Sequence, residues 1–391
     1  MFIGSVLLGI GIIGAGLSSA QRLEVPLNDQ WRFYRAEASG AEQSAFDDSG
    51  WEAVSVPHTY NALDAQDGGG NYYRGPAWYR KHFTLSAADA GKRVYLFFES
   101  VGKKAQVYCN GLPAGTHSGA YAAFCFDITD LVRFDSENVV AVRADNSSSL
   151  SIAPLSGDFN QYGGICRPVR LVLTEPVHIT LLDYASSGVY LKPTQVSSAS
   201  ADLEVKVLVR NAGADSRTAV VRAKIYDADD ALVDTLETEQ AIAGGTTQAV
   251  LLNTQIANPH LWHGPSDPYL YSVLTEVEID GTVADSVRQP LGFRYFSVDA
   301  NQGFFLNGQY LDLHGVAMHE DRTDKGRAIS DQDRVQDMEL MAEMGCNWIR
   351  LSHYQHAQKV YDLADEMGIV LSTEIPIVNG VVFTDEFIEN C

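Results

Sequence analysis

Short runs of β-branched and aromatic residues alternate with turn residues along positions 21–178. Regular spacing of this kind is typical of antiparallel β-sandwiches and jelly rolls. Asn110-Gly111 stands between two such runs and predicts a hairpin, because both residues tolerate positive φ. We therefore expect an N-terminal jelly-roll domain over 21–178, with its clearest strands at 93–100, 105–109, 139–143 and 169–173.

A second β segment, 179–298, has a cleaner alternation of apolar and polar positions. Its clearest runs are 203–209, 219–226 and 269–277. Pro259, Pro265 and Pro268 fall together and predict a loop, because proline cannot donate a hydrogen bond within a central strand. Roughly seven runs in a segment of this length predict an immunoglobulin-like β-sandwich.

From residue 299 the pattern changes to alternating strands and helices. Ser330 with Asp333 predicts a capped helix start, and Gly345 and Gly368 predict two helix ends. Met344 is expected on the buried face of the first helix, with Val335, Met338 and Met341. The expected elements are strands 310–314, 347–351 and 369–374, and helices 331–344 and 356–367.

Strands and helices joined by short connections form parallel βαβ units. A closed (β/α)₈ barrel needs about 250 residues, far more than residues 299–391 provide. The fold class is therefore multidomain β plus α/β: two sandwiches followed by about three βα units of an incomplete (β/α)₈ TIM barrel. We expect the chain to be the front portion of a longer protein, or a sequence cut short at Cys391.

Residues 1–20 carry no charged side chain, and the small residues Ser18-Ser19-Ala20 follow an apolar stretch. This pattern predicts a cleaved signal peptide and export to the periplasm or the extracellular space. A retained anchor and a buried strand stay open as alternatives, although the apolar run is short for a membrane span of about 20 residues. No later stretch is apolar enough to span a membrane, so no membrane partner is expected after cleavage.

The chain has 28 basic and 50 acidic residues, a formal net charge of −22. Such a surface repels nucleic acid and anionic lipid, so neither is an expected partner. Five cysteines without a C-x-x-C pair exclude a disulfide framework and a zinc site of recognisable spacing. One local disulfide, between Cys109 and Cys125, stays open.

Candidate chemistry gathers where the three expected parallel strands end. His319 follows the first strand, Arg350 and His353 belong to the second, and Glu374 ends the third. Barrel enzymes keep their active sites at this edge, and these side chains suit the hydroxyls of a sugar. Two alternatives are ordinary rim histidines held by carboxylates and, less favoured, a metal site at His314 and His319; we expect no metal site.

These residues lie within sequence motifs that resemble those of glycoside hydrolase family 2. The motifs in the barrel segment are 315–321 (GVAMHED) with Gly326-Arg327, and 347–356 (NWIRLSHYQH) with 365–368 (DEMG). Upstream motifs similar to the family's N-terminal sugar-binding domain are 56–61 (VPHTYN), 72–75 (YYRG) and 78–81 (WYRK). Residues 158–159 (DF) with 163–167 (GGICR) resemble the loop that reaches from that domain into the active site, and Asn307-Gly308 before the first barrel strand also fits the family. The resemblance covers the chain from about Trp31 to Glu374 in the family's order.

The resemblance implies a role for each candidate. Asp158 would contact sugar hydroxyls across the domain boundary, His319 and His353 would bind the ring near the transition state, and Arg350 would orient carboxylates beneath it. Two alternatives remain: Asp158 caps its own loop, and Glu374 only forms a salt bridge with Arg350. Residues 78–80 are expected in the jelly-roll core and edge rather than at a ligand.

Three positions depart from the family's usual residues: Ala317 replaces an Asn, Leu351 a small residue and Gln355 a Pro. Retaining glycosidases need two carboxyls, a proton donor and a nucleophile. In this family both are Glu at later barrel strands, so we predict no catalytic residue in this chain and expect both beyond Cys391. Glu386 and Glu389 are expected as solvated helix positions.

The resemblance implies an exported exo-acting glycosidase that hydrolyses terminal non-reducing β-galactosides by a retaining mechanism, with this chain inactive alone. The partner is then a β-linked galactoside or related oligosaccharide, and the acidic barrel segment mildly favours a neutral substrate. A β-glucuronidase is the first alternative, and a non-catalytic carbohydrate-binding fragment is the second. No cofactor is expected, while Mg²⁺ assistance and a homo-oligomer of the intact enzyme stay open.

Overall fold

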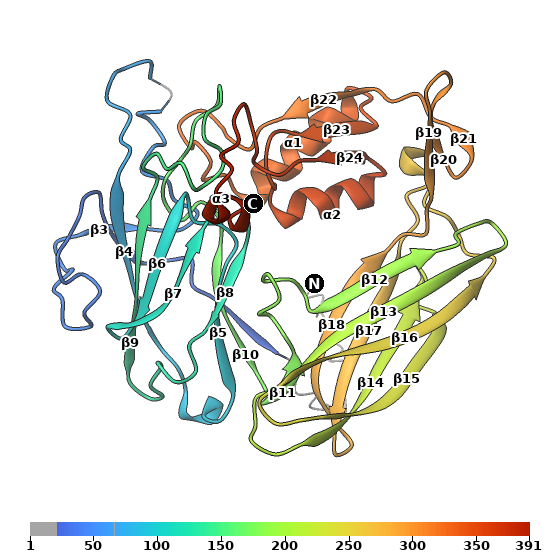
Figure 1. Cartoon of the computed structure of the whole chain (residues 1–391), viewed down its shortest axis with the longest axis horizontal. Coiled ribbons are helices and arrows are strands. Elements are labelled where there is room, and N and C mark those ends of the chain that lie inside the picture. The colour runs from blue at the N-terminus through green and yellow to red at the C-terminus, as the bar shows by residue number, and fades with distance from the viewer. Residues whose placement is uncertain (1–21, 66) are drawn as a thin grey trace, which may run out of the picture.

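Two β-sandwiches and a smaller α/β unit follow one another along the chain (Figure 1). The computed structural model describes residues 22–65 and 67–391. The predicted signal peptide lies outside the described residues. The three units meet, and the α/β unit lies along one side of the molecule, next to the first sandwich (Figure 1).

The first sandwich is a jelly roll with one apolar core that includes Trp31, Tyr79 and Phe98. Its elements are β1 Leu23–Pro26, β2 Trp31–Tyr34, β3 Glu52–Val54, β4 Pro76–Thr84, the 3-10 turn η1 Ala87–Asp89, β5 Arg93–Phe98, β6 Lys104–Cys109, β7 Leu112–Ser118, β8 Phe124–Asp127, β9 Glu137–Asp145 and β10 Val169–Thr174. One sheet runs β1-β10-β5-β8 and the other β3-β2-β4-β9-β6-β7. Asn110 and Gly111 take positive φ in the β6–β7 hairpin, as predicted.

The second sandwich packs two antiparallel sheets whose inward positions alternate along each strand, as in β13. Its elements are β11 Val177–Ile179, β12 Val189–Thr194, β13 Ser200–Asn211, β14 Arg217–Tyr226, β15 Leu232–Ile242, β16 Thr247–Ala257, the 3-10 turn η2 Gly264–Ser266, β17 Tyr271–Ile279 and β18 Thr282–Leu291. One sheet has the order β11-β13-β12 with β16 against β13, and the other β15-β14-β17-β18. The three prolines lie in the β16–β17 connection, as predicted.

A small antiparallel sheet, β19 Phe296–Asp299, β20 Gly303–Leu306 and β21 Gln309–Tyr310, precedes the barrel strands. The predicted strand 310–314 is therefore wrong. Asn307 and Gly308 take positive φ and turn the chain back, so Tyr310 pairs with Phe305. The first parallel strand is instead β22 Gly315–Met318, and Gly315 fits there because a Cβ would lie 1.8 Å from the carbonyl oxygen of Trp348.

Three parallel strands and three helices form the barrel segment. Its elements are β22, α1 Asp331–Glu343, β23 Trp348–Leu351, α2 Gln358–Met367, β24 Val370–Thr373 and α3 Asp385–Glu389, with sheet order β22-β23-β24. Ser330 and Asp333 form the predicted capping box, and Gly368 ends α2 with φ 77°. Apolar residues of α1 and α2 pack on Ile349 and Leu351 from one side of the sheet.

Two helix details differ from the prediction. Met344 is the C-cap of α1 and 72% exposed, because the helix ends before it can reach the buried face. His356 is not helical: it is buried before α2 begins, with its Nε2 3.3 Å from the carbonyl oxygen of Ser352.

Several side chains bear on questions raised by the sequence. All five cysteines are free, so Cys109 and Cys125 do not form a disulfide. Residues 78–80 are buried in the jelly roll, as predicted. No helix within 22–65 and 67–391 is long and apolar enough to cross a membrane. In the same ranges, no three His, Cys, Asp or Glu side chains are grouped so as to hold a metal ion.

Candidate active site

The carboxyl ends of β22, β23 and β24 place the predicted barrel residues next to one another. Because the strands are parallel and in register, residues that follow each strand share one edge of the sheet. The rings of His319 and His353 lie 5.3 Å apart, centroid to centroid. The Nδ1 atom of His353 lies 2.9 Å from a carboxylate oxygen of Glu374. The structure thus brings together the side chains that follow three separate strands.

Arg350, His353 and Glu374 form one polar group. The Nε of Arg350 donates to Glu374 at 2.5 Å, and its Nη2 lies 3.2 Å from the Nδ1 of His353. The hydrogen bond from Arg350, helped by His353, holds the pKa of Glu374 below its usual range. Glu374 therefore does form the salt bridge considered as its alternative role, and the same carboxylate also orients His353.

A loop of the jelly roll crosses to these residues. The ring of Phe159 lies 5.3 Å from that of His319 and 5.8 Å from that of His353. Tyr162 donates to Asp321 across the same boundary at 2.8 Å. Asp158 is exposed at the tip of this loop. The loop and the barrel strands therefore share one surface.

Charges on the loop and on the barrel segment both act on the pKa of His319. Burial lowers the pKa of His319, and the neighbouring His353 lowers it further. Asp321 and Asp158 act in the opposite direction, so the Asp158 carboxylate is near enough to interact with this ring. His319 is thus held mainly as a neutral imidazole at pH 7.

A buried lysine and a half-buried arginine hold the base of the loop. Lys103 donates to the carbonyl oxygen of Pro154 at 3.0 Å and to the side chain of Gln161 at 3.3 Å. Arg74 reaches the same Gln161 oxygen at 3.2 Å. Burial, with a contribution from Arg74, lowers the pKa of Lys103 to about 8.

A buried ionic cluster beneath the site was not predicted. Glu320, fully buried, pairs with Arg167 of the jelly roll at 2.6 Å and with Arg334 of α1 at 2.9 Å, and Arg327 lies 3.7 Å away. Burial alone would raise the pKa of Glu320, but the three guanidinium groups hold it well below its ordinary value. Glu320 and Arg167 both lie in motifs that resemble those of family 2, and this resemblance was the only sequence signal that could have pointed to the cluster.

Tyr354 joins this cluster to the site. Its ring stacks on Tyr121 of the jelly roll with centroids 4.0 Å apart, and the guanidinium of Arg327 lies 4.2 Å from the Tyr121 ring centroid. The hydroxyl of Tyr354 lies 3.2 Å from both the Nδ1 of His319 and the backbone N of Glu320. The position of His319 therefore depends on contacts between two domains.

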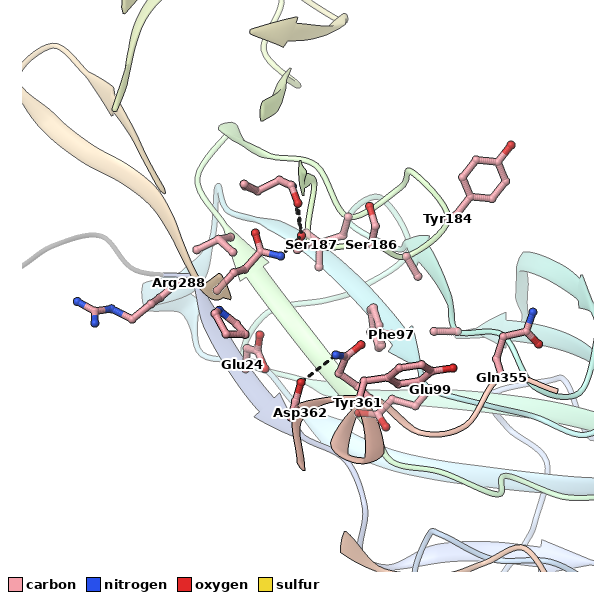
Figure 2. Close-up of a pocket in the computed structure, with 18 of the residues that line it drawn as sticks. Glu24, Phe97, Glu99, Tyr184, Ser186, Ser187, Arg288, Gln355, Tyr361 and Asp362 are labelled. Atoms are coloured by element: carbon pink, nitrogen blue, oxygen red, sulfur yellow. Dashed lines mark hydrogen bonds between the residues drawn. The ribbon is translucent and has the colours of Figure 1, made fainter. Parts of the chain in front are cut away.

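A separate cavity of about 1230 Å³ lies between the jelly roll, the second sandwich and α2. Phe97, Glu99, Tyr184, Gln355 and Tyr361 are among its lining residues (Figure 2). None of the five predicted site residues lines this cavity. The predicted site residues lie instead at the carboxyl ends of β22–β24, beside the Phe159 loop.

The carboxylates described at this edge suit binding better than proton transfer. Glu374 and Glu320 are both held ionised by guanidinium groups, so neither has the raised pKa of a general acid. Glu386 and Glu389 are exposed on α3, as predicted. Imidazole, carboxylate and aromatic side chains on one surface can together bind a polyhydroxylated ring.

Three family descriptions match consecutive parts of the chain. The glycosyl hydrolases family 2 sugar-binding domain matches residues 25–176, a further family 2 domain matches 184–294, and the family 2 TIM-barrel domain matches 297–389. The chain belongs to glycoside hydrolase family 2. It is thus assigned to a family of O-glycosyl hydrolases, as its sequence motifs implied.

Similar proteins carry two kinds of name. A β-glucuronidase of Bacteroides fragilis is 41% identical over 94% of this chain and 51% of its own length. A β-galactosidase of Bacteroides ovatus is 31% identical over 89% of this chain and 40% of its own length. The crystal structure of a Bacteroides uniformis β-glucuronidase has a TM-score of 0.92 and 37% identity, over 95% of this chain and 44% of that one. The family 2 chain thus spans about half the length of these relatives or less.

Proposed function

We propose that this family 2 chain provides the sugar-binding front of an exo-acting β-glycosidase that cleaves terminal β-glucuronides. The observation that carries the proposal is the contact of one jelly-roll side chain, Phe159, with His319 and His353 at two barrel strand ends. A sugar on this surface would touch both domains, with Asp158, Glu374 and the two imidazoles around it. Arg350 would hold Glu374 in place rather than contact a second carboxylate.

The preference for glucuronides replaces the order expected from the sequence, which put galactosides first. It is supported by the names of relatives, since those at 41% and 33% identity are β-glucuronidases and the β-galactosidase of B. ovatus is 31% identical. The acidic charge of the barrel segment is a long-range effect that salt screens, so it weighs little against an anionic substrate. A β-galactosidase remains the second candidate.

The proposed reaction retains anomeric configuration and needs a proton donor and a nucleophile about 5–5.5 Å apart. Glu374 cannot be the donor while Arg350 keeps it ionised. We therefore expect the 391-residue chain to bind sugar without hydrolysing it. The uncharged, apolar residues 1–20 support export of this chain.

Binding and turnover by the purified chain test the proposal together. Phenyl β-glucuronide should bind saturably in calorimetry and more tightly than phenyl β-galactoside, with no release of nitrophenol from either nitrophenyl glycoside above background. His353→Ala should abolish binding. His314→Ala is the matched control, because His314 is exposed and makes no contact with the other site residues. Tighter galactoside binding, equal loss in both variants, or measurable turnover would each contradict the proposal.

A further inference from the structure

The two site histidines each have one occupied ring nitrogen and one open one. The Nδ1 of His319 faces Tyr354, and the Nδ1 of His353 faces Glu374 and Arg350. Neither Nε2 has a hydrogen-bond partner in the described part of the chain, and neither is a buried unpartnered atom. Both Nε2 atoms therefore reach solvent and are available to a ligand.

The hydroxyl of Tyr354 determines where the proton of His319 lies. The backbone N–H of Glu320 donates to this hydroxyl at 3.2 Å, so the oxygen already accepts one hydrogen bond. If the Nδ1–H of His319 also donated, the hydroxyl proton would be buried with no acceptor, since none other in the described ranges lies within reach. A buried donor without an acceptor is strongly disfavoured, because it has lost its hydrogen bond to water and gained none in return. The O–H therefore donates to Nδ1, and the ring proton of His319 lies on Nε2.

Tyr354 is well placed to impose this choice. Its side chain is 4% exposed and stacked against Tyr121, so the hydroxyl cannot swing to another partner. Burial raises the pKa of Tyr354 above its ordinary value, so the hydroxyl keeps its proton at neutral pH.

His353 has the opposite arrangement. Its Nδ1 lies 2.9 Å from a carboxylate oxygen of Glu374, which can only accept, and 3.2 Å from a guanidinium nitrogen of Arg350, which can only donate. A bare Nδ1 would direct its lone pair at the carboxylate, whereas an Nδ1–H makes the shorter, charge-assisted bond. The ring proton of neutral His353 therefore lies on Nδ1, and its Nε2 carries a lone pair.

We propose that Tyr354 and Glu374 hold the two neighbouring imidazoles in opposite tautomers, so that the site offers one N–H donor and one lone-pair acceptor to a single sugar. This deepens the proposed function and rests on it only for the identity of the ligand. A sugar with two adjacent hydroxyls matches the pair, since one hydroxyl can accept from His319 and the other can donate to His353. A carboxylate has no proton to give His353, so the acidic group of a glucuronide would face away from that ring.

Histidine-selective ¹⁵N labelling of the ligand-free chain reads both tautomers directly. Long-range ¹H–¹⁵N correlations should show an Nε2–H ring for His319 and an Nδ1–H ring for His353 at neutral pH. His319→Gln and His353→Gln assign the two signals among the ten histidines. An Nδ1–H ring at His319, or an Nε2–H ring at His353, would overturn the proposal whatever ligand the site takes.

Two variants test the groups that set the tautomers. Tyr354→Phe removes the donor, so His319 should show a mixture of tautomers and its pKa should rise by roughly 0.5 to 1. Glu374→Ala leaves only Arg350 beside the Nδ1 of His353, so that ring should switch to the Nε2–H form. Tyr121→Phe is the matched control: it keeps the aromatic stack, removes a hydroxyl that does not touch His319, and should change neither ring. An unchanged His319 signal in Tyr354→Phe would contradict the assigned role of Tyr354.

Ligand titration separates this proposal from the proposed function. Opposite tautomers with no sugar-induced shift would preserve the tautomer assignment and reject the sugar site. Saturable shifts at both rings with phenyl β-glucuronide, together with loss of the His319 shift in His353→Gln, would support both the tautomer assignment and the sugar site.

Discussion

The two sandwiches and the barrel segment bury their cores in different ways. Each sandwich encloses its apolar residues between two sheets of its own. In the barrel segment α1 and α2 cover one face of β22–β24, while the other face carries Ala317, Arg350 and Ser372 in one row. The sandwiches are closed units, and the barrel segment is a half-covered sheet.

Because the barrel segment is only half covered, its site residues are held in position partly by the jelly roll. The barrel segment supplies His319, His353 and Glu374, but the groups that hold its edge include Arg167, Tyr121 and Phe159 of the jelly roll. We conclude that the jelly roll is part of the site's scaffold as well as a neighbouring domain. The comparison can be tested by separating the units and then by weakening single contacts.

Separating the units should have the largest effect. Residues 22–298 are expected to unfold cooperatively, because both sandwiches keep their cores. Residues 299–391 alone should not fold, because β24 has an unpaired edge and Glu320 loses its partner Arg167. Circular dichroism and thermal melts of the two fragments check this. A cooperative melt of 299–391 alone would show that the barrel segment does not depend on the jelly roll.

Glu320→Ala should have the next largest effect. The change leaves three guanidinium groups buried without their common carboxylate, so the free energy of unfolding should fall by about 3–5 kcal/mol. Urea titration followed by fluorescence measures it. Glu339→Ala on the exposed side of α1 is the control and should stay within about 0.5 kcal/mol of the parent. Equal values for both variants would mean that the cluster adds little to domain docking.

The pH dependence of stability should reveal a smaller contribution from His356. Burial lowers its pKa to about 4, whereas an unfolded histidine titrates near 6.5. Because the folded pKa is depressed, this stability is fully present above pH about 6.5 and lost as the pH falls toward 4. Between pH 7 and 5 the loss is roughly 2 kcal/mol.

His356→Leu should therefore flatten the pH profile of the unfolding free energy by that amount. His314→Leu, at an exposed position, should leave the profile unchanged. Urea titrations at pH 7, 6 and 5 compare the two variants with the parent. The same slope in all three proteins would show that His356 titrates normally.

Local sequence signals predicted most of the fold. The Ser330–Asp333 capping box, the Asn110-Gly111 hairpin and the stop at Gly368 each act within a few residues, so the sequence window that carries the signal contains the whole interaction. The strand at 310–314 was wrong because Asn307-Gly308 returns the chain onto β20, and apolar pattern alone does not show which partner a strand takes. Met344 was misplaced because helix ends shift by a residue or more.

The site was predictable only where strand direction determines position. Parallel strands put His319, His353 and Glu374 at one edge, and the loop containing Asp158 was expected to cross the boundary. Glu320 and Arg167 are 153 positions apart, and charged residues are usually exposed, so no local pattern marks them as a buried pair. The bond from Tyr354 to His319 likewise depends on the tertiary fold.

The central claim is that one sugar site is built from a jelly-roll loop and barrel strand ends, and Asp158→Ala tests it most directly. Asp158 is exposed and makes no hydrogen bond within the described residues, so the melting temperature should not change in Asp158→Ala. Of the changes described above, this one should affect stability least. Charge-assisted bonds to hydroxyls contribute about 1.5–3 kcal/mol, so affinity for phenyl β-glucuronide should fall roughly 10- to 150-fold. Asp130→Ala, at another exposed position of the jelly roll, is the control. Unchanged affinity with a clearly lowered melting temperature would show that Asp158 only caps its own loop, and would contradict the shared site.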